Sequence, residues 1–171
     1  NLNFYYHQII NILNESYICK LKLTIGSFMA DIILEAGGTL AFTFHVLFML
    51  FNAFVVYQFF LNNKFYDQLG YSNEEPKTIF RGVLGVVFLA ILLMSILLTF
   101  DVTGNTYEEN VVQYKFWYSF LFILFAMATI NGFLRFYNLV NNYGFKPTIR
   151  GLMFPLIGII LIIIRTIFEG Y

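Results

Sequence analysis

Seven polar side chains lie within or at the ends of long apolar runs, where lipid surroundings would make them costly. Polar groups in such places usually face the interior of a helical bundle, and they mark binding sites, proton paths or contacts between helices. They are His45, Asn52, Asp101, Asn131, Arg135, Arg165 and Glu169. We expect these positions either to bind something or to hold the chain together.

The first and third runs each carry uncharged polar groups at depth. His45 and Asn52 are seven residues apart, so they share one helix face with Gly38. Asn131 reaches a depth similar to that of Asn52, which makes a hydrogen bond between the first and third helices geometrically possible. The alternative is a proton or ligand path through His45. Its run contains no carboxylate that could relay a proton, and this favours contacts between helices.

Charged residues lie near the ends of the third and fourth runs. Arg135 can extend to the lipid headgroups, as long cationic side chains do. Arg165 and Glu169 are one helical turn apart, on the membrane face where Asp101 ends the second helix and Glu35 precedes the first. An ion pair there would fasten the fourth helix to its neighbours. Recognition of a lipid phosphate and contact with a transported substrate are the alternatives for Arg165.

Catalytic motifs are missing from the sequence. The two histidines, His7 and His45, are far apart, and Cys19 is the single cysteine. HExxH, glycine-rich phosphate loops and the Gly-x-Ser-x-Gly elbow do not occur. The acidic pairs at 74–75 and 108–109 are expected to be solvated loops and not metal ligands. We therefore expect no enzyme activity, no metal and no cofactor.

Four apolar runs must position these side chains. A helix needs roughly 20 mostly apolar residues to cross the hydrocarbon layer. The runs that meet this requirement cover residues 36–61, 79–100, 116–139 and 152–168. Continuous apolar runs predict helices and not barrel strands, because backbone groups in lipid must bond within their own segment. Pro155 falls in the expected first turn of the fourth helix, where a missing N–H costs little.

Polar connections at 62–78, 101–115 and 140–150 separate the runs. Connections this short join antiparallel neighbours, so the sequence predicts an all-α polytopic protein with four antiparallel transmembrane helices in residues 34–171. Residues 1–33 mix apolar and polar side chains, and they predict an N-terminal interfacial segment. The first and third connections carry more Lys and Arg than the opposite side, which places them in the cytosol or matrix and both termini across the membrane.

Composition limits the partners. Of the 171 residues, 59% are hydrophobic and 12% charged, against roughly a quarter charged in soluble domains. Lipid must cover such a surface. The net charge is zero and the cations are scattered, so nucleic acid is not an expected partner.

These features lead to two principal hypotheses for the function. The first is a structural or accessory subunit of a larger membrane complex, with a respiratory-chain or ATP synthase assembly of the mitochondrial inner membrane as its setting. Its partners would be other membrane-protein subunits and membrane lipids. The second is a small transporter or lipid-handling protein with an intramembrane polar site. A proton-conducting core subunit is a third possibility.

Overall fold

The chain folds into helices throughout the part that the structure describes. The structure is a computed structural model, and it describes residues 20, 22, 24–62, 64–69, 74–101, 106–140 and 147–169. A segment that is helical over residues 24–35 is followed by α2 (Thr39–Leu61), α3 (Phe65–Leu69), α4 (Glu74–Thr99), α5 (Tyr107–Phe136) and α6 (Ile149–Ile167). Four of these are long and apolar enough to cross a membrane: α2, α4 from Gly82, α5 and α6. This confirms the predicted all-α polytopic fold.

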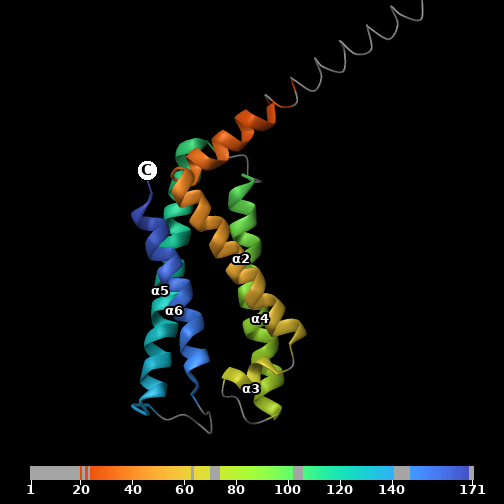
Figure 1. The fold of residues 1–171 in the computed structure, drawn as a ribbon, viewed down its shortest axis with the longest axis vertical. Coiled ribbons are helices and arrows are strands. Elements are labelled where there is room, and N and C mark those ends of the chain that lie inside the picture. Colours follow the sequence, from red (N-terminus) through yellow and green to blue (C-terminus); the bar gives the residue numbers. More distant parts are fainter. Residues whose placement is uncertain are drawn as a thin grey trace, which may run out of the picture.

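The four long helices run alternately up and down (Figure 1). Helix α2 packs against α4 and α6, and α5 packs mainly against α6, whereas α4 and α5 touch only sparsely. The short helix α3 lies against α6 and α2 at the end of the bundle opposite to Glu169. The bundle therefore consists of two helix pairs, α2–α4 and α5–α6, joined mainly through α2 and α6.

Each long helix buries a narrow stripe and leaves its other faces outside. The buried positions of α2 are spaced three and four residues apart, the pattern that places side chains on one helix face. They are Ala41, His45, Phe48, Asn52, Val55 and Phe59. Aromatic rings join these stripes in the core, where Phe48 and Phe88 each contact Phe125 at centroid distances of 5.9 and 6.1 Å. The apolar surface that remains outside suits lipid or neighbouring helices.

The predicted start of the third helix was wrong. Helix α5 begins at Tyr107 and not at residue 116, so residues 107–115 belong to the helix and not to the connection. Thr106 and Glu109 form a capping box: the Thr106 hydroxyl accepts from the Glu109 N–H, and the Glu109 carboxylate accepts from the Thr106 N–H. Acidic residues stabilise the first turn of a helix through its dipole. The polar and acidic residues at 106–109, which suggested a loop, therefore mark the start of the helix.

The expectation for Pro155 was also wrong. Helix α6 begins at Ile149, after the N-cap Thr148, so Pro155 lies inside the helix and not in its first turn. The Thr148 hydroxyl accepts from the Gly151 N–H and donates to the carbonyl of Gln68 in α3. This cap starts the helix earlier than hydropathy alone indicates.

Two glycines end the N-terminal helical segment and separate it from α2. Gly37 and Gly38 have φ values of +97° and +104°, a region that favours glycine. The Gly38 N–H donates to the Ile33 carbonyl and the Gly37 N–H to the Leu34 carbonyl, the two bonds of a Schellman ending. The helical segment therefore continues past residue 33 and turns away from α2 at these glycines (Figure 1). Residues 1–19, most of the predicted interfacial segment, lie outside the described residues.

Candidate functional site

Arg165 is the most deeply buried charge in the described part of the chain, with a side chain that is 1% exposed. Its Nη1 donates to the Glu169 carboxylate at 2.8 Å, and its Nη2 donates to the Ala36 carbonyl at 2.7 Å. Ala36 is the last residue of the N-terminal helical segment before the Schellman glycines. A cation at a helix C-terminus satisfies a free carbonyl and complements the negative end of the dipole. Arg165 therefore joins the end of α6 to the end of that segment.

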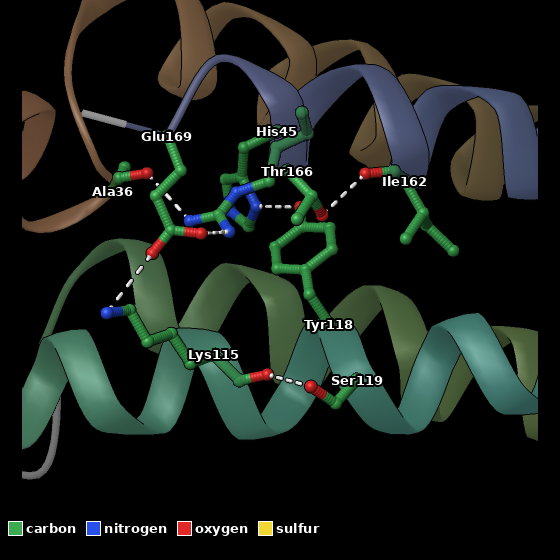
Figure 2. Close-up of polar contacts among 9 residues, drawn as sticks. Ala36, His45, Lys115, Tyr118, Ser119, Ile162, Thr166 and Glu169 are labelled. Carbon is green, nitrogen blue, oxygen red and sulfur yellow. Dashed lines mark hydrogen bonds and ion pairs between the residues drawn. The ribbon is translucent and has the colours of Figure 1, made fainter. Parts of the chain in front are cut away.

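An aromatic ring and a second cation complete the surroundings of Arg165. Its guanidinium carbon lies 4.3 Å from the centroid of the Tyr118 ring, within cation–π range. The second carboxylate oxygen of Glu169 lies 4.0 Å from Lys115 Nζ, whose side chain is 63% exposed (Figure 2). Glu169 thus connects one buried and one exposed cation. The predicted Arg165–Glu169 pair is confirmed, and it reaches neighbouring helices through Ala36, Tyr118 and Lys115.

His45 continues this arrangement into the bundle. Its Nδ1 lies 2.5 Å from the Tyr118 hydroxyl, and its Nε2 lies 2.8 Å from Thr99 Oγ1. The Thr99 hydroxyl donates to the Ser95 carbonyl at 2.8 Å, so it accepts from His45 Nε2–H. In the neutral imidazole Nδ1 is then the acceptor for the Tyr118 hydroxyl proton, so the neutral form carries its proton on Nε2. Both ring nitrogens of His45 therefore have hydrogen-bond partners.

A further hydrogen bond beside these residues joins Trp117 of α5 to Ser95 of α4. Trp117 Nε1 donates to Ser95 Oγ at 3.2 Å, and that hydroxyl donates to the Ile91 carbonyl at 2.9 Å. The Trp117–Ser95 bond joins α4 to α5, as does the Phe88–Phe125 ring contact, while the Ser95–Ile91 bond lies within α4. We call the connected side chains the intramembrane network: Arg165, Glu169, Tyr118, His45, Thr99, Ser95 and Trp117. It contains residues from α2, α4, α5 and α6.

The hydrogen bond between Asn52 and Asn131 that equal depth made possible does not form. Asn52 is fully buried, and its Nδ2 donates to the Phe48 carbonyl of its own helix at 2.8 Å. Asn131 is exposed and accepts from Arg135 Nε at 3.2 Å within α5. Equal depth does not place two side chains on facing sides of their helices. The two residues therefore belong to different surfaces, and Arg135 is half-buried beside Asn131.

Asp101 and Glu35 lie at the same end of the bundle as Arg165 but do not pair with it. Asp101 follows α4 with φ +43°, and Glu35 accepts from Asn110 Nδ2 at 3.1 Å. Partial burial raises the pKa of the Glu35 carboxyl above its ordinary value, and the nearby charges of Asp101 and Asp31 raise it further, while the Asn110 bond opposes them. Glu35 thus connects the N-terminal helical segment to the first turn of α5.

Sequence reasoning missed the two tyrosines and the threonine that surround His45 and Arg165. Tyr114 and Tyr118 are four residues apart, and Asn110 precedes them by four, so all three share a face of α5. Ser95 and Thr99 repeat this spacing in α4. A search for polar residues at i and i+4 would have detected both stripes.

Few buried polar atoms of the described site residues lack a hydrogen-bond partner. Among the described residues, three buried side-chain atoms have no hydrogen-bond partner: Asn52 Oδ1, Tyr114 Oη and Arg165 Nε. Within the same part of the chain, His, Cys, Asp and Glu do not gather in threes as a metal ion would require. The arrangement can therefore hold helices together, and it offers few free groups for a ligand.

No protein-family model, curated protein or solved structure matches the chain. Its class follows from the fold and the site: it is an α-helical multi-pass membrane protein whose four candidate spans share one intramembrane polar network.

Proposed function

We propose that the protein is a non-catalytic structural subunit of a larger membrane complex. One observation carries this proposal: both ring nitrogens of His45 and both terminal nitrogens of Arg165 bond to groups of the same chain. Polar side chains that transport a substrate must leave donors or acceptors free for it. Here those groups hold helices to one another, which supports a structural role.

The outer faces supply the surface for partners. On α5, large apolar side chains that are more than half exposed follow the helix along its length: Phe116, Ile123, Met127 and Ile130. In a bilayer such side chains pack against acyl chains or neighbouring transmembrane helices. Other membrane-protein subunits and lipids are therefore the partners we propose.

We propose an energy-converting complex of the mitochondrial inner membrane, a respiratory-chain or ATP synthase assembly, as the setting. Such assemblies contain many small spanning subunits without catalytic residues, and the apolar exterior and the bonding of His45 and Arg165 within the chain suit that role. Mass spectrometry of chains that co-purify with the tagged protein from its native membrane tests both the complex and the organelle.

The assembly test uses the full chain extracted in a mild detergent. We expect it to elute with a constant set of other membrane proteins. We expect Arg165→Leu to lose that association, because the α6 end would no longer be held to Ala36 and Tyr118. Arg150→Leu is the matched control, since Arg150 is exposed and bonds to Gln68 at the other end of α6. Elution of the unchanged protein as a monomer or homo-oligomer would contradict the proposal.

A lipid-handling protein is the second candidate, and a groove between α5 and α6 favours it. Under this hypothesis Arg165→Leu leaves the assembly state unchanged but lowers lipid transfer between vesicles. The same pair of variants therefore separates the two functions.

A further inference from the structure

A groove of about 590 Å³ lies between α5 and α6 and opens on the outside of the bundle. Its walls include exposed apolar side chains from both helices: Phe122, Ile123, Ile163 and Ile167. The buried side chains of Tyr118 and Arg165 form its floor. A shape of this kind, apolar and open along its side to the bilayer, suits a hydrocarbon chain.

The groove has a polar end and an apolar end. Lys115 and Glu169 line it where α5 starts and α6 ends (Figure 2). Ile123 lies about 12 Å deeper along α5 than Lys115, by the rise per residue of a helix. The groove therefore runs from the membrane interface towards the hydrocarbon layer, in the direction that a phospholipid takes from headgroup to chain.

Among the described residues that line the polar end of the groove, the charges leave one cation in excess. Arg165 and Lys115 are positive and Glu169 is negative, which gives a net charge of +1. Glu169 binds Arg165 at 2.8 Å but Lys115 at only 4.0 Å. Lys115 is thus the loosely held cation, and its exposed ammonium can donate to an anion. The hydroxyls of Ser119 and Thr166 donate to carbonyls of their own helices, so they do not compete as donors.

We propose that this groove binds one anionic phospholipid, with an acyl chain along Phe122, Ile123, Ile163 and Ile167 and the phosphate at Lys115. One negative headgroup charge balances the excess cation. A lipid bound here would fill the outer seam between α5 and α6. This site shares Ile123 with the apolar face of α5 that is proposed for partners, but it does not depend on the subunit proposal.

The test measures lipids retained by the purified full chain. The protein is incorporated into bilayer discs of phosphatidylcholine with or without phosphatidylglycerol, released, and weighed intact by mass spectrometry. We expect the unchanged protein to retain phosphatidylglycerol in preference to phosphatidylcholine. We expect Lys115→Met to lower that preference about fivefold, the effect of one basic residue near an anionic surface.

Two further variants locate the binding. Lys64→Met removes an exposed lysine at the opposite end of the bundle, and we expect it to retain phosphatidylglycerol like the unchanged protein. Ile163→Trp fills the groove from an exposed position, and we expect it to lose both lipids. Helical circular dichroism and elution volume establish that each variant is folded.

Four results would overturn the proposal. They are no lipid preference in the unchanged protein, an equal preference in Lys115→Met, unaltered retention in Ile163→Trp, and displacement of the lipid by excess inorganic phosphate at constant ionic strength. The last result would assign the cation to a free phosphate and not to a phospholipid.

Discussion

Replacement of Arg165 by methionine tests the idea that this side chain holds helix ends together. Methionine has a similar length and no charge, so the variant removes the contacts to Ala36, Glu169 and Tyr118 without a large cavity. Loss of a charged donor to the buried Ala36 carbonyl costs about 1.5–3 kcal/mol. Loss of the cation–π contact with the Tyr118 ring costs about 1–2 kcal/mol.

The ion pair adds less to this sum. The Glu169 side chain is 21% exposed and lies near Lys115, so water and that ammonium can stabilise its charge once Arg165 is gone. An exposed pair contributes up to about 1 kcal/mol. The sum of these contributions gives an expected loss for Arg165→Met of about 2.5–6 kcal/mol. Glu169→Gln keeps the contacts of Arg165 with Ala36 and Tyr118 and leaves an amide oxygen that can accept from Nη1, so we expect it to lose less stability than Arg165→Met.

Reversible unfolding by a denaturing detergent in mixed micelles measures both variants. The chain has one tryptophan, Trp117, which bonds to Ser95 within the intramembrane network, so its fluorescence reports on that region. Far-ultraviolet circular dichroism follows the helices as a whole. Equal losses for Glu169→Gln and Arg165→Met would refute the reasoning, because the ion pair and not the helix-end contact would then carry the stability.

Three further predictions concern packing and pH. Gly158→Ala should destabilise the α5–α6 pair by about 1–3 kcal/mol, because its Cβ would lie 2.1 Å from the Phe125 ring, and Phe125→Leu in the same chain should recover part of this loss in thermal unfolding. Gly37→Ala should lower the melting temperature, since Gly37 has φ +97° and a Cβ would lie 2.9 Å from Glu169 Cγ. The raised pKa of Glu35 means that the folded chain binds this proton more tightly than the unfolded chain, so its stabilising contribution is present at low pH and is lost as pH rises through the folded pKa. Glu35→Gln should accordingly be more stable than the unchanged protein at neutral pH and should flatten the dependence of unfolding on pH.

The controls for these variants come from the same chain. Gly82→Ala matches the glycine variants because, among the described residues, no atom outside the adjoining stretch of α4 lies within 4 Å of its added Cβ. Alanine also favours a helix, so stability should hold or rise. Unchanged stability of Gly158→Ala would contradict the close α5–α6 approach. A pH dependence that is the same in Glu35→Gln and the unchanged protein would show that another group titrates.

The predicted fold class needed only local information. The four apolar runs are each long enough to cross the hydrocarbon layer, and they must be helical because lipid leaves the backbone no partners outside its own segment. The short connections between them predicted the alternating direction. The pairing of Arg165 with Glu169 was predictable from local spacing, since side chains four residues apart on a helix lie on the same face. Helix boundaries at Tyr107 and Ile149 were missed where capping residues overrode hydropathy.

The partners across helices were decided by the tertiary structure alone. Depth can be counted from the sequence, but the rotation of each helix about its axis cannot, and rotation determines which side chains face each other. It directs Asn52 inward and Asn131 outward, and it brings His45 to Tyr118 and Thr99. Burial of Arg165 against the Ala36 carbonyl likewise required the glycine break to place a free carbonyl beside the end of α6. The sequence by itself thus determined that the chain spans a membrane as helices, and side-chain packing among those helices decided which polar groups meet.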